Sequence, residues 1–261
     1  MSAEQLEGGL ANTGRVTRVG DVVRRPAPPN APLLHSLLRH LARRAFRAPR
    51  PHALEEDGYE LPGFVPGDVP IAPYPSWAST DSALAGVARL LRRFHDSVAD
   101  FEIPDDAQWN VELADPHGGP VVCHNNVCLE NVVFSAGTPI ALLDFDFAAP
   151  GRPVWDVVHA ARYWIPLTDP ALAVASGRGQ GDPFARLRRF VDAYGLDAED
   201  RRAFPDILLE AEEVAVGFVT GRVSRGESAF IEMWDTAGQE RFRRKMAWLE
   251  RNLRTLREAL A

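Results

Sequence analysis

The chain has 261 residues, of which 46% are apolar and 25% are charged, with a formal net charge of −7. This size allows one large domain or two lobes, and the negative charge argues against a nucleic-acid partner, because phosphate backbones require a basic face. No stretch approaches the ~20 apolar residues that cross a bilayer, and the N-terminus lacks the basic and apolar regions of a secretory signal. We therefore expect a cytoplasmic protein without membrane contact.

The first part of the chain predicts two hairpins with a helix between them. Turn signals at Gly20-Asp21 and Asp57-Gly58 separate pairs of short predicted strands. Apolar residues at helical spacing lie between the hairpins, and prolines follow the second one. In chain order, the predicted elements are strands 15–19 and 21–25, a helix over 33–46, strands 52–55 and 59–65, and a stiff connector over 62–75.

The second part is predicted to be mostly helical. Its helices have apolar residues three and four positions apart, which is the pattern of one buried face. They are expected over residues 80–98, 154–164, 183–194, 198–223 and 228–260. Cys123 and Cys128 stand between the first two helices without a second metal-binding pair. We therefore expect reduced thiols and neither a disulfide framework nor a structural zinc site.

Polar residues interrupt the strand, loop, strand, turn, strand pattern of residues 121–149. The spacing is H-x-N-x-x-x-x-N, in which the three named positions are His124, Asn126 and Asn131. Asp144 follows thirteen residues after Asn131, where an apolar run ends, and Asp146 comes two residues later. Carboxylates at the end of a buried run need partners. The alternative is an ordinary polar turn followed by an ordinary buried strand.

This segment resembles the catalytic and metal loops of the aminoglycoside phosphotransferase and choline kinase group, whose members are related to the protein kinases. The resemblance covers about residues 6–250 and is strongest over 121–159. It implies an α+β, bilobal protein-kinase-like fold with a small antiparallel sheet plus helix in the N-lobe and a mostly helical C-lobe. Residues 1–67 would clamp the nucleotide, and residues 68–261 would carry the catalytic and metal loops.

The resemblance also implies roles for the loop residues. Asn131 and Asp144 would hold Mg²⁺ on the phosphates of ATP, and His124 would belong to the catalytic loop. Asn126 stands where the group has its catalytic aspartate; it keeps the shape of that residue but cannot act as a useful base. Asp146 would share the metal, replace the missing base, or lie in an outer shell facing solvent. Asp156 would brace the catalytic loop, or simply begin a helix favourably.

In the N-lobe the resemblance implies a glycine-rich strap over the phosphates, for which Gly9 and Gly14 are candidates. A glycine-rich turn without a ligand is the alternative. Relatives place a strand lysine on the phosphates and pair it with a helix glutamate; here the alignable residues are Arg25 (or Arg24) and His35. Arginine binds phosphate as a fork, and its alternative is a surface position on an edge strand.

The expected partner is a small molecule, or a peptide, whose hydroxyl accepts phosphate. A cationic acceptor would suit an acidic wall on the later helices, whose candidates are Asp192, Glu210, Glu212 and Glu213. Three functions stay open: a working phosphotransferase, a pseudokinase that binds nucleotide without turnover, and a fold redeployed in a biosynthetic pathway. The sequence does not indicate an oligomeric state.

One further motif is interpreted as a coincidence. Residues 234–242, WDTAGQERF, reproduce a segment of Ras-like GTPases, but residues 9–16 have neither the lysine nor the hydroxyl residue of a P-loop. We expect this segment to be helical, with Trp234 and Phe242 packed and Asp235, Gln239 and Glu240 facing solvent.

Overall fold

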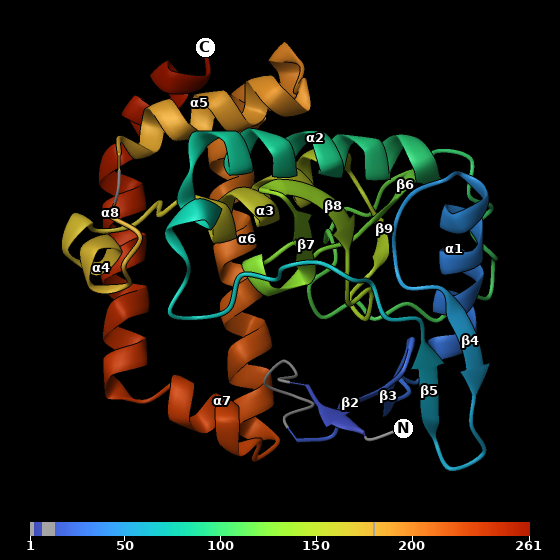
Figure 1. Cartoon of the computed structure of the whole chain (residues 1–261). Helices are drawn as coiled ribbons and strands as arrows, with labels where there is room; N and C mark the ends of the chain where they lie inside the picture. The colour runs from blue at the N-terminus through green and yellow to red at the C-terminus, as the bar shows by residue number, and fades with distance from the viewer. Residues whose placement is uncertain (1–2, 7–13, 180) are drawn as a thin grey trace.

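The computed structural model describes residues 3–6, 14–179 and 181–261, and places an antiparallel sheet beside a larger helical part (Figure 1). The sheet and helix α1 come from the N-terminal part, and the long helices from the C-terminal part. This arrangement confirms the predicted α+β fold. Among the described residues, no helix combines the length and the apolar character that a membrane span requires.

The N-terminal sheet is built from hairpins. Its strand order is β1-β2-β3-β5-β4, and every neighbouring pair is antiparallel. Helix α1 buries the apolar residues Leu34, Leu37, Leu38 and Leu41 that the periodicity predicted. The bounds are β1 Glu4–Gln5, β2 Thr17–Val19, β3 Val22–Pro26, α1 Ala31–Arg43, β4 Pro51–Leu54 and β5 Tyr59–Pro62.

The C-terminal part surrounds two small antiparallel pairs with helices. Strand β7 (Val132–Ser135) pairs with β8 (Thr138–Leu142), and β6 (Val121–Cys123) pairs with β9 (Ala149–Gly151). Short 3-10 turns η2 (Ser76–Ser79) and η3 (Leu129–Asn131) precede α2 and β7. The helices are α2 Asp81–Val98, α3 Pro153–Trp164, α4 Pro170–Ala175, α5 Pro183–Tyr194, α6 Ala198–Ser224, α7 Ser228–Met233 and α8 Thr236–Leu260.

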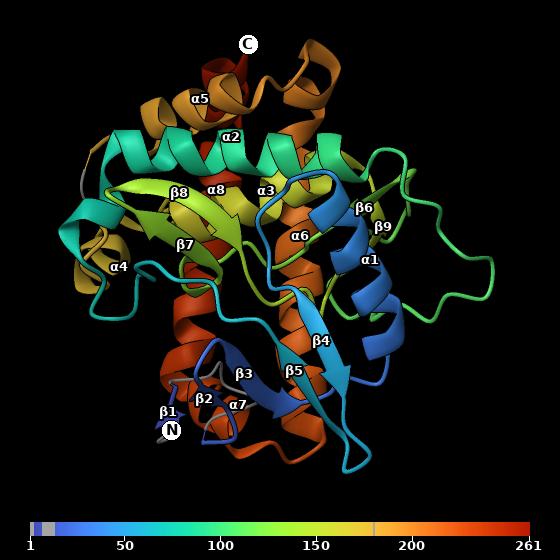
Figure 2. The same cartoon turned by 45° about the vertical axis from the view of Figure 1, so that its right-hand side comes forward.

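One hydrophobic cluster joins the two parts. It includes the buried face of α1 together with α2, the β7–β8 hairpin, α3 and α5. Phe94, Phe134 and Trp155 are among its largest fully buried side chains. Figure 2 shows α2 lying across the hairpin and α1 beside it, with the strands β3 and β5 below. The core therefore fixes the loops between β6 and β9 against the end of the N-terminal sheet.

The chain passes between the parts in close contact with β7. Asp68 and Phe134 exchange two backbone hydrogen bonds of 2.8 Å each. A Cβ on Gly67 would lie 2.4 Å from the Phe134 carbonyl oxygen, and the φ of Gly67 is 150°, so a glycine is required there. The predicted boundary between residues 67 and 68 falls at this joint, and the division into two lobes stays a prediction.

The structure differs from the prediction in the last helix. Residues 228–260 form two helices because the Asp235 side chain accepts a hydrogen bond of 2.7 Å from the Gly238 N–H and caps α8. Asp235, Gln239 and Glu240 are exposed, and the rings of Trp234 and Phe242 lie 5.8 Å apart. The Ras-like segment is thus a junction between two helices and not part of one helix, whereas the predicted exposure of its polar residues is confirmed.

Candidate functional site

The loop after β6 is held by a buried histidine. The His124 Nε2–H donates to the Leu143 carbonyl at 2.8 Å, and Nδ1 accepts from the Asn126 N–H at 3.3 Å. This network assigns the tautomer. Burial lowers the pKa of His124, so the ring is neutral. His124 therefore joins the loop to the segment that carries Asp144, and both of its ring nitrogens are occupied.

Asp156, in the first turn of α3, holds the same loop through hydrogen bonds to its backbone. Its carboxylate accepts hydrogen bonds from the backbone N–H groups of His124 (2.7 Å) and Asn125 (2.9 Å), and from His95 Nε2 (3.0 Å). Burial would raise the pKa of Asp156, but the bond and charge of His95 and the contact with His124 outweigh it and keep the pKa low. The brace implied by the resemblance is therefore present.

Asn126 and Asn131 are linked to each other. The Asn131 Nδ2–H donates to the Asn126 carbonyl at 2.9 Å, which leaves the amide oxygen of Asn131 available for a cation. The Asn131 carbonyl also accepts from the Leu143 N–H at 2.8 Å. Within the described ranges the Asn126 side chain is half-buried and makes no hydrogen bond. The catalytic-loop position thus offers a polar but uncharged side chain.

The two acids after β8 meet Arg25 from strand β3. Arg25 Nη1 lies 3.2 Å from Asp144 Oδ1, and Nη2 lies 2.5 Å from Asp146 Oδ1. Asp144 has a φ of 56°, an uncommon conformation for a residue with a side chain. Burial and the neighbouring charge of Asp144 raise the pKa of Asp146 to about 7, against the opposing effect of Arg25. Arg25 therefore binds both acids across the junction of the two parts.

Arg25 is itself held by a third acid. Its Nε–H donates to Glu60 Oε1 at 2.7 Å, and the other Glu60 oxygen lies 2.8 Å from His35 Nε2 on α1. Burial would lower the pKa of Arg25, but the charges of Asp146, Asp144 and Glu60 raise it above the ordinary value. The position of the family's helix glutamate is thus filled by His35, and Glu60 of β5 supplies the carboxylate.

Sequence reasoning missed Glu60. Its signal was available, because strand β5 alternates buried and half-buried residues and Glu60 falls at a buried position. Arg24, the other arginine considered for phosphate, points to the opposite side of β3. It pairs with Glu55 at 2.7 Å and with Asp57, and its guanidinium lies 3.6 Å from the centre of the Tyr59 ring.

The predicted glycine strap lies only partly within the described residues. Gly9 lies outside the described residues. Gly14 has a φ of 74°, and among the described residues no atom lies within 4 Å of the position a Cβ would take there. The strap stays a prediction.

The residues of this site fit a magnesium ion. They are the amide oxygen of Asn131 and the carboxylates of Asp144 and Asp146, and hard divalent cations prefer such oxygen ligands. A guanidinium already lies on both carboxylates, so the site attracts positive charge. Arg25 and a metal would compete for the same oxygens.

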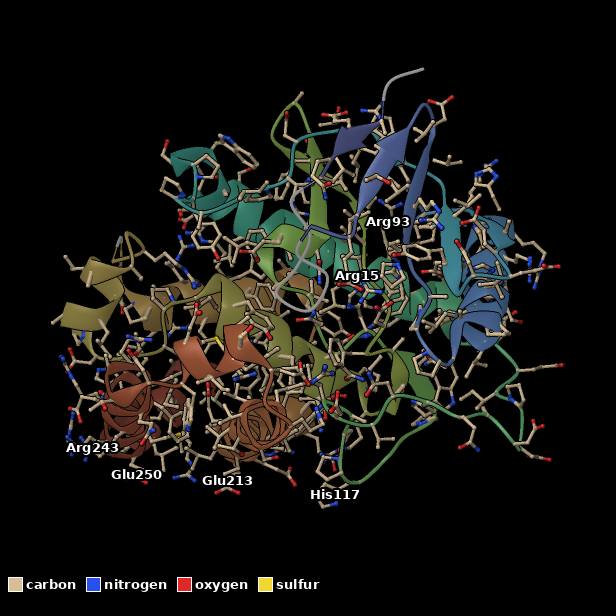
Figure 3. All side chains as sticks on the ribbon, turned by 90° about the horizontal axis from the view of Figure 1, so that it is seen from below. Arg15, Arg93, His117, Glu213, Arg243 and Glu250 are labelled. Atoms are coloured by element: carbon tan, nitrogen blue, oxygen red, sulfur yellow. The ribbon has the colours of Figure 1, made fainter. Side chains whose placement is uncertain are left out.

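The predicted acidic wall is not one surface. Glu212 is buried between Arg162 (2.8 Å) and Lys245, and these cations lower the pKa of Glu212 to about 2 although burial opposes them. Glu213 is exposed on the outer side of α6 (Figure 3), and Glu210 lies 2.9 Å from His117. Asp192 lies on α5 and pairs with Arg201 at 2.6 Å.

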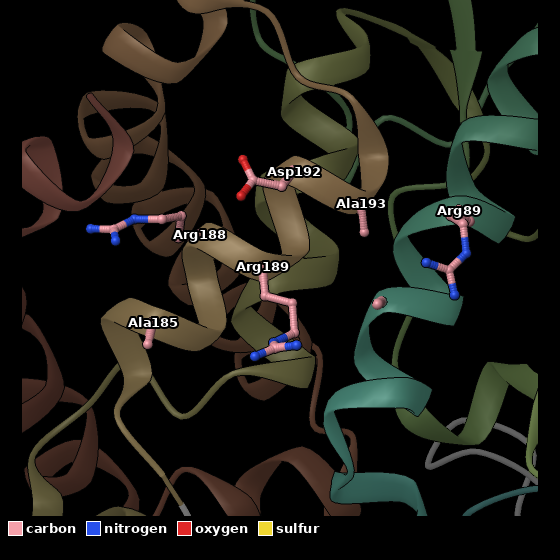
Figure 4. Close-up of a pocket in the computed structure, with 7 residues that line it drawn as sticks. Arg89, Ala185, Arg188, Arg189, Asp192 and Ala193 are labelled. Atoms are coloured by element: carbon pink, nitrogen blue, oxygen red, sulfur yellow. The ribbon is translucent and has the colours of Figure 1, made fainter.

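Two surface hollows lie away from the loops. One lies between α2 and α5 and is bordered by Arg89, Arg188, Arg189 and Asp192 (Figure 4). The other lies between the end of α1 and β5. Neither includes a residue of the 124–131 or 144–146 segments. The candidate site therefore rests on the contacts of its side chains and not on these hollows. Cys123 is buried and Cys128 half-buried, and both are free thiols, as predicted.

Comparisons in sequence and fold relate this chain to known proteins. Residues 106–194 match the model of the phosphotransferase enzyme family. The trifolitoxin immunity protein of Rhizobium leguminosarum bv. trifolii is 30% identical over 269 residues, with 98% of each chain covered. A choline/ethanolamine kinase family protein from Mesorhizobium loti has a TM-score of 0.63 at 14% identity, covering 100% of this chain and 92% of its own. Amicoumacin kinase in complex with AMP-PNP and Ca²⁺ has a TM-score of 0.58 at 13% identity, covering 98% and 88%. The chain therefore belongs to the phosphotransferase enzyme family, is related to the trifolitoxin immunity protein, and has the choline kinase and aminoglycoside phosphotransferase-like fold.

Proposed function

We propose that this protein binds MgATP between the sheet and the catalytic loop, and transfers phosphate slowly to a hydroxyl of a small molecule or peptide. The observation that supports this proposal most is the joint placement of Asn131 and Asp144. The Leu143 residue beside Asp144 is bonded to Asn131 through its N–H and to His124 through its carbonyl. One backbone hydrogen bond and one bond from the His124 side chain thus hold the residue before Asp144 against the loop that carries Asn131.

Each residue then has a role in binding or orientation. Asn131 and Asp144 would hold the metal, which neutralises phosphate charge when bound, and Asp146 would add a further oxygen. Arg25 would move its fork from the two carboxylates to the phosphates while keeping its bond to Glu60. Asn126 would orient the acceptor hydroxyl through its amide oxygen, but it does not take the proton. Residues 1–67 would act as the nucleotide clamp and residues 68–261 as the catalytic lobe.

A second function is favoured by the same loop. Asn126 stands where the family has its catalytic aspartate, so the loop lacks that base. A relative of this chain is an immunity protein. A protein of this fold that binds a toxic compound in the cleft without phosphorylating it would also confer protection. In that case nucleotide binding would persist, and phosphoryl transfer would be absent.

The two functions are separated by a transfer assay. The protein is incubated with ATP labelled at the γ-phosphate. Small-molecule and peptide fractions of a culture that produces candidate acceptors are added. Label in an organic product that disappears with Asp144→Ala supports transfer. Nucleotide binding without any labelled product supports the second function and contradicts the first.

A further inference from the structure

A group of three cations, one buried and two half-buried, lies beside the catalytic loop and is not used by the phosphate site. Its members are Arg162 at the end of α3, Arg178 after α4 and Lys245 on α8, which is the single lysine of the chain. Lys245 pairs with Glu212, which also binds Arg162 through two bonds of 2.8 and 3.0 Å. The Arg178 guanidinium donates to the Tyr163 carbonyl. We refer to Arg162, Arg178 and Lys245 as the cation cluster.

The cluster carries more positive than negative charge. Glu212 is the buried carboxylate that pairs with Arg162 and Lys245. Burial lowers the pKa of Arg178, and the charge of Glu130, which accepts from the Tyr74 hydroxyl at 2.6 Å, acts to raise it, while the nearby Arg186 pairs with Asp81. Three cations thus face two carboxylates, which leaves one positive charge. Buried charge without a partner is costly. A monoanion would complete the balance.

Unused donors point to the same conclusion. Arg162 Nη1 is buried and has no hydrogen-bond partner in the described part of the chain. Arg178 makes its side-chain bond to a neutral carbonyl, and no carboxylate lies within ion-pair distance of it among the described residues. Burial lowers the pKa of Arg178 and of Lys245, and the charges of Arg162 and Arg178 add to the effect on Lys245. These donors are available to an anion.

The cluster adjoins the loop that carries Asn126, because Arg178 donates to the carbonyl of Tyr163, the neighbour of Trp164. The Trp164 indole N–H donates to the Val127 carbonyl at 2.9 Å, which fixes the end of α3 to the residue after Asn126. Tyr163, whose pKa burial raises to about 12, also senses Cys128 and Glu130 of the loop. Lys245 keeps 23% of its side chain exposed, so solvent reaches this side of the cluster.

We propose that the cation cluster binds a carboxylate of the acceptor molecule and so places its hydroxyl at Asn126. This proposal rests on the proposed function for the identity of the site as an acceptor site. It predicts an acidic acceptor, such as a hydroxy acid or a peptide with a free carboxyl group, in place of the cationic acceptor expected from the sequence. Arginine forks match carboxylate geometry through paired hydrogen bonds.

The test compares N-acetylserine with N-acetylserinamide, which share the hydroxyl and differ in the carboxylate. Dissociation constants are measured by ligand-observed NMR on the full-length protein without nucleotide. We expect the acid to bind at least about 10-fold more tightly than the amide, since a bond to a charged group exceeds a neutral one by such a margin. Arg178→Gln and Lys245→Met should each remove this preference, and if Lys245→Met fails to fold, Arg178→Gln still decides.

Arg254→Gln is the matched control, because it also removes one positive charge but from a side chain that is 89% exposed. It should keep the preference for the acid. Equal binding of acid and amide, binding of neither, or a preference that survives both cluster variants would overturn the proposal. MgATP binding is measured on the same samples. If the wild-type protein prefers the acid but does not bind MgATP, only the proposed function is contradicted. If it binds MgATP but does not prefer the acid, only the cation-cluster proposal is contradicted.

Discussion

At the scale of single residues, the loop separates positioning from proton transfer. His124, Asn125 and Asp156 hold the backbone of the loop through hydrogen bonds that do not involve the Asn126 side chain. A change at Asn126 therefore alters chemistry with little effect on the fold. Asp156, in contrast, is fully buried, and the loop depends on it.

Asn126→Asp should raise phosphoryl transfer or background ATP hydrolysis by roughly 10²-fold, the lower range for a restored general base. The variant is compared with the wild-type protein in a coupled ATPase assay, after both have been shown to bind nucleotide. Asn126→Ala serves as the control and should not increase the rate. An unchanged rate in a folded, nucleotide-binding Asn126→Asp protein would show that more than the base has been lost.

Asp156→Asn should lower the free energy of unfolding by about 3 kcal/mol, as expected when one member of a buried charged network is removed. Its folded pKa is depressed, so its stabilisation is present above the unfolded value and is lost as the pH falls through the folded value. Urea unfolding measures both effects. Asp206→Asn, on an exposed pair with Arg257, should cost less than about 0.5 kcal/mol; equal costs would contradict the brace.

At the scale of elements, strand β3 and the segment after β8 are tied by one side chain. Arg25 reaches Asp144 and Asp146, while its neighbour Arg24 faces Glu55 and Asp57. Successive strand residues point to opposite sides, so these arginines form a natural comparison. Arg25 contacts the proposed metal ligands, and Arg24 does not.

Arg25→Gln should tighten Mg²⁺ binding in the absence of nucleotide by about 10-fold, because it removes a competing cation from two carboxylates. The same variant should weaken MgATP binding, since the arginine fork is lost from the phosphates. Isothermal calorimetry measures both affinities. Arg24→Gln should leave both unchanged. If Arg25→Gln does not affect Mg²⁺ affinity, Arg25 and the metal do not share ligands.

Helices α3, α6 and α8 meet at Glu212, which makes their packing sensitive to acid. Its pKa falls from 4.5 to about 2 in the fold, so the carboxylate stabilises the protein fully above pH 4.5 and loses this effect as the pH falls toward 2. The amount is on the order of 3 kcal/mol at 1.36 kcal/mol per unit. Glu212→Gln should flatten the pH dependence of unfolding over this window. A wild-type slope retained in the variant would contradict this assignment.

The sequence was sufficient for the elements whose signals are local. The helices α2, α3 and α5 begin where Thr80, Pro153 and Asp182 provide starts, and the hairpin turns fall at the expected glycines. The loop spacing located Asn126, Asn131 and Asp144. The pairing of β6 with β9, the bond between Asp68 and Phe134, and the partners of Arg25 are contacts between distant residues, which periodicity does not encode.

At the scale of the whole molecule, the fold brings a cation from the sheet onto acids of the helical part. The N-terminal and C-terminal parts share a hydrophobic core through α1 and are joined again at Arg25. Nucleotide binding would therefore require Arg25 to rearrange its ion pairs with Asp144 and Asp146. We propose that the metal binds at this junction through Asn131 and Asp144.

The most direct measurement is calorimetric titration of ATP into the wild-type protein and into Asp144→Ala, each with and without Mg²⁺. We predict that the wild-type protein binds ATP more tightly when Mg²⁺ is present, and that Asp144→Ala loses this dependence while it remains folded. Absence of nucleotide binding at millimolar concentration, or equal Mg²⁺-dependent binding by Asp144→Ala, would contradict the account.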